Sequence, residues 1–161
     1  MRSKAAIGDH PIHPALVPIP IGAFVLGLIG DIAHASTGDP FWYRFAFVAI
    51  GVGVVTALLA ALFGAIDYFG VPMGDPARRL ATWHLVMNVT AVGLYAFSFL
   101  IRRHGGALNT PRWTTAMGLA IAGFLLLGVS GWIGGRLAYE HHVGVVESSE
   151  KQPVAGARRT A

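Results

Sequence analysis

Residues 41–66 read FWYRFAFVAIGVGVVTALLAALFGAI, an apolar run that carries a single charged residue, Arg44. A helix needs about 20 residues to cross the hydrocarbon core of a bilayer, so this run is long enough to span it. Three further apolar runs occupy residues 15–35, 80–101 and 113–138. The sequence therefore predicts an all-α integral membrane protein with four spanning helices.

The composition of the 161-residue chain agrees with a protein that lies in a lipid bilayer. Hydrophobic residues make up 54% of the chain and charged residues only 12%, whereas soluble domains contain about 25% charged residues. The chain has no cysteine. This excludes disulfides, thiolate zinc sites, ordinary iron–sulfur ligation and covalent c-type haem attachment. Any metal or haem must therefore be bound by His, Met, carboxylate or carbonyl groups.

Short polar connections join the four apolar runs, over residues 36–40, 67–79 and 102–112. Short links between helices favour antiparallel neighbours, so we predict an up-down-up-down four-helix bundle within residues 1–146. The remaining residues, 147–161, read ESSEKQPVAGARRTA and contain few bulky apolar side chains. For this segment we predict a disordered polar tail.

Lysine and arginine are distributed unevenly over the two sides of such a bundle. The side with both termini and the second connection carries eight, against four on the other: Arg2, Lys4, Arg78, Arg79, Arg136, Lys151, Arg158 and Arg159 against Arg44, Arg102, Arg103 and Arg112. The positive-inside rule then places both termini in the cytoplasm. The net charge of +4 is interpreted as this topology signal. No basic stripe with interleaved aromatic residues indicates binding to nucleic acid.

Polar side chains gather at one face of the predicted bundle. They are His10 and His13 before the first span, Asp67 and Tyr68 at the end of the second, His84 and Asn88 in the third, and Tyr139 and His141 after the fourth. His84 and Asn88 are four residues apart and share one helix face, and polar side chains in a membrane span usually face the bundle interior. Asp31 and His34 lie at the opposite face, where we favour a structural role for Asp31.

Two of these histidines belong to a proline-rich segment, His10-Pro-Ile-His13-Pro, in front of the first span. A residue that precedes proline is disfavoured in the α conformation. We therefore predict that His10 and His13 lie outside any helix, on a stiff segment. Pro18 and Pro20 lack the backbone N–H that a helix interior requires, so we expect the first span to start late or to kink there.

The first functional hypothesis is a haem b protein that transfers electrons in the membrane. Imidazoles on facing helices of a four-helix bundle can hold haem iron. His84 would be one axial ligand and His13 the other, with His141 or His10 as the next candidates. Other residues would orient the imidazoles or pair with the haem propionates: Asp67, Tyr68, Asn88 and Tyr139 for the first role, and Arg78, Arg79 and Arg136 for the second.

The same histidines also suit a single metal ion. If His10, His13 and His84 act together with Asp67, the set of three imidazoles and one carboxylate fits zinc, copper or iron. The haem and metal hypotheses predict different absorption spectra, so colour separates them.

Two further hypotheses need no cofactor. The chain could be a non-catalytic membrane subunit or anchor, whose His and Asp side chains form a structural hydrogen-bond layer. It could also move protons or ions along Asp67, His84 and Tyr95, although the second and fourth spans contain few polar groups. No catalytic signature of a hydrolase and no phosphate-binding loop occurs in the sequence. The chain therefore does not read as a conventional soluble enzyme.

Several motifs resemble a known family. The stretches HPIHPALVPIPIG, GAIDY, RRLATWHLVMNVTAVGLY and GWIGGRLAYEHHVGV, together with Asp31, are similar to the four-span bacterial membrane family catalogued as domain of unknown function 2231. The resemblance covers roughly residues 9 to 146 and implies a bacterial inner-membrane protein without a known reaction. Some relatives are joined to Rieske-type iron–sulfur domains, which hints at electron transfer, although this sequence has no cysteine with which to build such a centre. His141 matches the family motif, whereas His142 stands where the family often has glycine.

Overall fold

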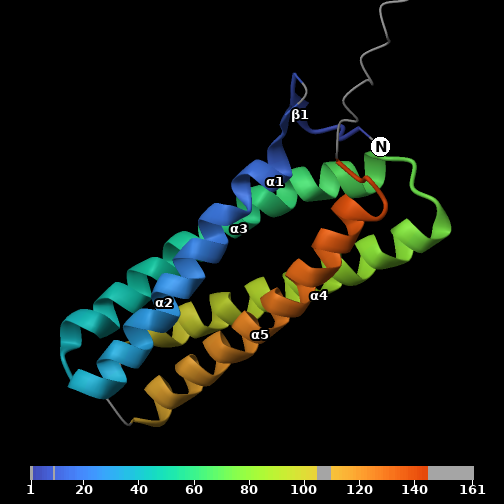
Figure 1. The fold of residues 1–161 in the computed structure, drawn as a ribbon. Coiled ribbons are helices and arrows are strands. Elements are labelled where there is room, and N and C mark those ends of the chain that lie inside the picture. The colour runs from blue at the N-terminus through green and yellow to red at the C-terminus, as the bar shows by residue number, and fades with distance from the viewer. Residues whose placement is uncertain (1, 9, 105–109, 145–161) are drawn as a thin grey trace, which may run out of the picture.

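The computed structural model describes residues 2–8, 10–104 and 110–144. In this part of the chain a short hairpin precedes a bundle of long helices (Figure 1). The elements are β1 (Ala6–Ile7), β2 (His10–Pro11), α1 (Ile12–Leu16), α2 (Pro18–Thr37), α3 (Pro40–Gly70), α4 (Asp75–Arg102) and α5 (Pro111–Tyr139). Four stretches are long and apolar enough to cross a membrane: α1 with α2, and then α3, α4 and α5. The predicted all-α membrane bundle is confirmed, and the predicted tail lies outside the described residues.

The helices begin and end where local chemistry requires it. Prolines occupy the first turns of α2, α3, α4 and α5, where the missing N–H has no intrahelical partner to lose. The Asp39 carboxylate accepts a hydrogen bond from the backbone N–H of Phe41 at 2.8 Å and caps α3. Gly38 ends α2 with a φ of 69°, a left-handed conformation that costs glycine little. These signals keep the link between α2 and α3 short.

The first span is interrupted between α1 and α2 at Val17. Pro18 and Pro20 cannot donate to the carbonyl groups four residues before them, but Val17 keeps helical dihedral angles. The predicted late start was wrong, because helix begins already at Ile12. His10 lies in β2, as predicted, but the prediction that His13 lies outside any helix was wrong. His13 belongs to α1, because Pro14 occupies the first turn of that helix and needs no hydrogen bond there.

Contacts between the helices define their relative directions. In α2 and α3, Gly27 faces Ile50 while the earlier Phe24 faces the later Gly53, so the two helices are antiparallel. The carbonyls of Ala116 and Ser130 on α5 face Ser98 and His84 on α4 respectively, so these two helices are also antiparallel. Phe24 stacks on Tyr95 and Asp31 pairs with Arg102, so α2 and α4 run in the same direction.

Small residues bring the helix backbones close together. Ala46, Ala60, Ala91, Ala116 and Ala120 are buried where the helices meet. Close approach of this kind replaces the hydrophobic driving force that is absent inside a bilayer. Some glycines do not take part: a Cβ at Gly93, Gly118 or Gly131 would meet nothing within 4 Å in the described structure.

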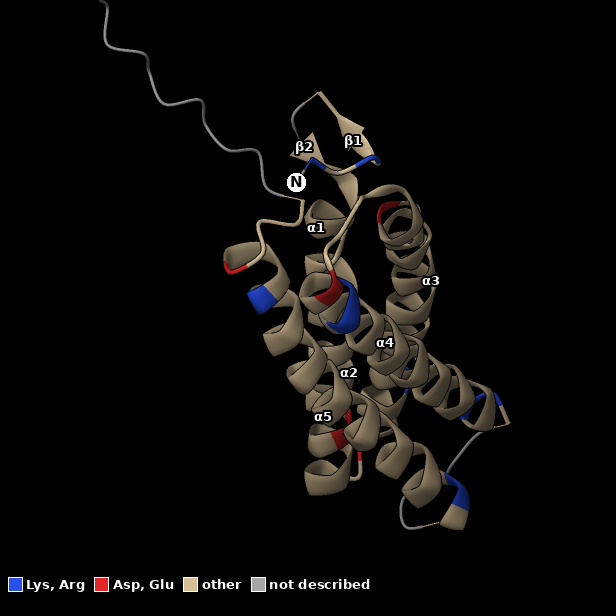
Figure 2. Cartoon of the chain, turned by 90° about the vertical axis from the view of Figure 1, so that its right-hand side faces the viewer, with Lys and Arg blue, Asp and Glu red and all other residues tan. Residues whose placement is uncertain are grey.

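The outer surface of the bundle is apolar along most of its length. Figure 2 shows charged residues mainly toward the helix ends, with long uncharged stretches between them. Large side chains such as Val55, Val89 and Leu125 are 60%, 60% and 64% exposed. An apolar surface this extensive would be a liability in water. It suits contact with lipid chains.

We predict that Gly53→Val destabilises the bundle by about 1–3 kcal/mol, because overpacking forces neighbouring side chains or backbone to shift. A Cβ at this position would lie 2.5 Å from Cε1 of Phe24, whose ring is held in a stack. The measurement is the thermal unfolding midpoint in detergent. Gly93→Val is the control, since open space surrounds that glycine. Equal midpoints for the two variants would contradict the close packing of α2 on α3.

Candidate functional site

The structure brings together two of the predicted histidines, His13 from α1 and His84 from α4. Their ring centroids are 6.5 Å apart and their planes meet at 86°. One metal atom bonded to both rings, with metal–nitrogen bonds of about 2 Å, would hold two imidazole centroids roughly 6 Å apart. We call these two side chains the histidine pair. The pair joins residues that lie far apart in the sequence.

Each ring of the histidine pair is fixed by a backbone carbonyl on a neighbouring helix. His13 Nδ1 donates to the carbonyl of Ala60 at 2.8 Å, and His84 Nδ1 donates to the carbonyl of Ser130 at 2.9 Å. A carbonyl only accepts, so the hydrogen of each ring lies on Nδ1. In the neutral ring Nε2 then keeps its lone pair, the form that binds metal ions.

Glycines make room for the two rings. A Cβ at Gly64 would lie 2.9 Å from His13 Nδ1, and a Cβ at Gly134 would lie 2.9 Å from His84 Cε1. Contacts under 3.0 Å are too short for a real side chain, so each ring needs a glycine beneath it. Gly64 and Gly134 are thus positioning residues that inspection of the sequence did not identify.

A small polar network supports His84 from behind. The Asn88 amide donates to Ser130 Oγ at 2.6 Å and to the carbonyl of His84 at 2.8 Å. Ser130 is fully buried, and its hydroxyl lies 3.0 Å from His84 Nδ1. Asn88 therefore occupies the supporting position predicted for it, with Ser130 as the residue between. Ser130 was missed because a serine in a Gly-rich span gives little signal by itself.

Asp67, a predicted ligand or supporting residue, is engaged elsewhere. Its carboxylate accepts hydrogen bonds from the Ser3 hydroxyl at 2.8 Å, the backbone N–H of Lys4 at 2.7 Å and that of Ala5 at 3.1 Å. The end of α3 thereby ties down the segment that leads into α1. Asp67 thus helps to position His13 from a distance, through the chain.

Tyr68 and the arginines of α4 close the link between α3 and α4. Arg78 donates to the carbonyls of Tyr68 and Val71, and its guanidinium lies 4.9 Å from the centre of the Tyr68 ring. The Tyr68 hydroxyl lies 3.0 Å from Thr82 Oγ1. Arg79 is exposed. These contacts stabilise a loop, and they do not involve the histidine pair.

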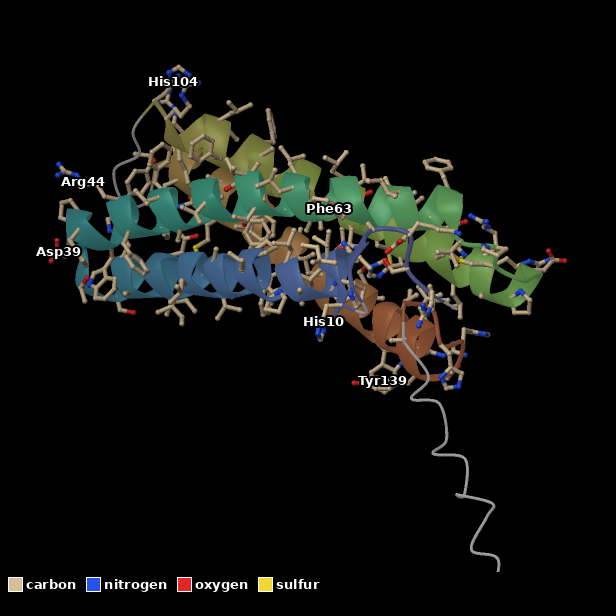
Figure 3. The ribbon with its side chains drawn as sticks, turned by 90° about the horizontal axis from the view of Figure 1, so that it is seen from above. His10, Asp39, Arg44, Phe63, His104 and Tyr139 are labelled. Carbon is tan, nitrogen blue, oxygen red and sulfur yellow. The ribbon has the colours of Figure 1, made fainter. Side chains whose placement is uncertain are left out.

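The other predicted residues lie at or near the surface. Figure 3 shows His10 and Tyr139 projecting outward, and both side chains are exposed. His141 is half-buried and its backbone N–H donates to the carbonyl of Arg136 at 3.3 Å. The Arg136 guanidinium also hydrogen-bonds the exposed Glu140 carboxylate, which lowers the pKa of Glu140. Within the described residues, no three or more His, Cys, Asp or Glu side chains form a group that could hold a metal ion.

A second polar centre lies at the other end of the bundle. Asp31 on α2 and Arg102 on α4 form two parallel hydrogen bonds, of 2.6 and 2.7 Å, and neither side chain is exposed. Arg102 Nε also donates to Ser98 Oγ at 3.2 Å, and its carbonyl accepts from the Tyr43 hydroxyl at 3.0 Å. The structural role favoured for Asp31 matches this ion pair. Arg102 was taken for a loop charge because it ends the apolar run.

His34 lies beside this ion pair, between two aromatic rings. Its ring centroid is 5.6 Å from that of Tyr43 and 5.9 Å from that of Trp113. His34 Nδ1 donates to the carbonyl of Asp39 at 2.9 Å, which ties the end of α2 to the start of α3. Three buried polar atoms have no hydrogen-bond partner within the described residues: His34 Nε2, Tyr95 Oη and Trp113 Nε1.

Comparison with known proteins gives a family but no solved relative. The family of predicted membrane proteins DUF2231 matches residues 9–147. The chain belongs to this family. No curated protein and no solved structure matches the chain. The DUF2231 region includes the histidine pair and the Asp31–Arg102 ion pair, so both centres lie within the family domain.

The backbone conformation of His142 in this DUF2231 chain is one that glycine adopts more readily. His142 has a φ of 51°, in the left-handed region where residues other than glycine are uncommon. The resemblance had indicated that glycine often occupies this position in the family. A glycine would adopt the same conformation without strain. His142 therefore departs from the family at a position that favours glycine.

We predict that Asp31→Asn destabilises the protein by about 3–5 kcal/mol, because it leaves the Arg102 charge buried without its partner. The double variant Asp31→Leu/Arg102→Met is expected to lose less stability, since both charges are then removed. Unfolding in detergent measures both effects. Arg136→Ala, which removes an exposed pair, is the control and should change little. A double variant less stable than Asp31→Asn would contradict this account.

We also predict that Asp67→Ala increases the rate of tryptic cleavage after Lys4 severalfold. The substitution removes the carboxylate that holds Ser3, Lys4 and Ala5, so the segment opens locally more often. Timed proteolysis with mass spectrometry follows the cut. Asp75→Ala removes an exposed carboxylate near the same end and serves as the control. Unchanged cleavage in Asp67→Ala would show that the tether is unimportant.

Proposed function

We propose that the histidine pair binds haem b, with His13 and His84 as the two axial ligands, and that the protein transfers electrons within the membrane. The observation that carries this proposal is the arrangement of the two rings. They are 6.5 Å apart, and each has its Nδ1 occupied by a carbonyl. Two neutral imidazoles from facing helices are the ligands that haem iron takes in helical bundles.

The set of ligands favours haem over a metal ion bound by protein side chains alone. Zinc, copper or non-haem iron takes three or four protein ligands, and within the described residues no such group is found. A porphyrin supplies four nitrogens itself, so two imidazoles complete the coordination of its iron. With both axial positions filled by protein, electron transfer is a more suitable role than oxygen binding.

The family and the distribution of charges support a proposal for the location. We propose the bacterial inner membrane, with both termini in the cytoplasm as the Lys and Arg distribution indicates. The electron donor or acceptor would then meet the protein at the end of the bundle that carries the histidine pair. Arg79 is the exposed basic residue we assign to this end for contact with haem propionates.

A second candidate is a non-catalytic membrane subunit or anchor. It is favoured by the number of polar groups that already satisfy one another, such as His84 with Ser130 and Asn88. In that case the histidine pair stabilises the bundle and binds no cofactor.

An absorption spectrum of the full chain in detergent separates the two candidates. Protein reconstituted with haemin should show a Soret band that shifts on dithionite reduction and a sharp α band. His13→Ala and His84→Ala should each reduce haem content at least tenfold, whereas His104→Ala, an exposed histidine at the opposite end (Figure 3), should not. Wild-type protein that binds neither haem nor metal, with metal analysis of the same sample, would support the non-catalytic candidate.

A further inference from the structure

Three pairs of residues join the first half of the chain to the second along the length of the bundle. The rings of the histidine pair are 6.5 Å apart, two aromatic rings stack at 3.7 Å, and two charged groups bond at 2.6 Å. The two members of each pair are separated by the same 71 positions in the sequence: His13 and His84, Phe24 and Tyr95, Asp31 and Arg102. Equivalent positions of two segments therefore meet at three successive depths.

The helices behind these residues correspond in the same way. His13 bonds the carbonyl of Ala60, and His84 bonds that of Ser130, which lies 70 positions later. Phe24 lies against Gly53, where a Cβ would be 2.5 Å from the ring. Tyr95 lies against Gly123, again 70 positions later, where a Cβ would be 2.9 Å away. These contacts in one helical hairpin thus have counterparts in the other.

The glycines beneath the two histidines follow the same shift. Gly64 faces His13, and Gly134, 70 positions later, faces His84. The helix starts also match, since Asp39 caps α3 and Thr110, 71 positions later, caps α5. A shift that stays within one residue across both hairpins indicates a repeated unit.

We infer that the chain consists of two copies of one helical hairpin, related by a pseudo-two-fold axis that runs along the bundle between α2 and α4, and that the histidine pair lies on this axis. Parallel segments whose equivalent residues meet at three successive depths are related by such an axis, as in an isologous dimer. Parallel repeats about an axis normal to the membrane are a known membrane architecture. In this chain the two hairpins correspond to the two subunits of such a dimer, joined in one polypeptide.

The axis defines the class of cofactor more narrowly, and this step rests on the proposed function. Two equivalent imidazoles approach the axis from opposite repeats, so a group that they share must offer two equivalent coordination positions. The number of protein ligands then favours a metalloporphyrin over a bare ion. A metalloporphyrin offers one axial position on each side of the ring. His13 and His84 would then hold the group from opposite sides, one from each repeat.

The ion pair marks where the two copies have diverged. A symmetric dimer of the first hairpin would bring two copies of Asp31 together, and a dimer of the second would bring two copies of Arg102 together. Buried like charges repel strongly. Complementary charges at this position therefore favour assembly of the two different repeats over pairing of like repeats.

The first test replaces each axial ligand in turn by methionine in the full chain. Wild type, His13→Met and His84→Met are loaded with haemin, and their spectra and midpoint potentials are compared. If the ligands are equivalent, both variants show matching six-coordinate spectra and matching upward shifts of potential, since methionine ligation raises it. If haem binds but one variant keeps the wild-type spectrum, the shared-ligand inference is overturned while haem binding stands. If wild-type protein binds no haem, the proposed function and the shared-ligand inference both fail.

The second test addresses the axis without any cofactor. Asp31→Arg and Arg102→Asp should each lower the melting temperature in detergent, because like charges then meet. The inverted variant Asp31→Arg/Arg102→Asp should recover more than half of that loss, since each side chain enters the position of its counterpart. Recovery should stay incomplete, because Gly27 stands where the native arginine finds Ser98. An inverted variant no more stable than the single variants would overturn the pseudo-two-fold relation.

Discussion

The bidentate bond between Asp31 and Arg102 fixes the register of α2 against α4. Counting 18 residues back from each partner leads to His13 and to His84. With a rise of about 1.5 Å per residue, equal distances along two parallel helices place both imidazoles at the same depth. A contact at one end of the bundle therefore sets the alignment of the side chains at the other end. Phe24 and Tyr95, stacked between these two ends, preserve the same register midway.

A layer of polar groups inside a membrane protein is expensive unless each group is matched. In the histidine pair, one nitrogen of each ring takes part in a bond between helices and the other does not. The bond from each histidine to a carbonyl occupies Nδ1, and that bond alone would secure the helices. The second nitrogen of each ring has no part in this task. In the proposed function, these two nitrogens are the atoms that would bind the cofactor.

Much of the fold could be predicted because apolar length and short links constrain a membrane chain strongly. Spacing within one helix placed His84 with Asn88, and the alternation of spans brought His13 near them. The sequence could not predict the hydrogen-bond partners of Asp67, because these depend on how residues 3–5 fold back onto the end of α3. The repeat also escaped notice, since corresponding positions are often complementary instead of identical, as aspartate is to arginine.

The ion pair also has a consequence for how the protein is made. Asp31 enters the membrane with the first hairpin, but its partner follows only 71 residues later. At about 5–20 residues per second, ribosomes take roughly 4–14 s to supply it. During that interval the Asp31 carboxylate lacks the partner that it has in the folded protein. Synthesis of α4 supplies Arg102 and His84 together, so both contacts with the first hairpin become possible at the same stage.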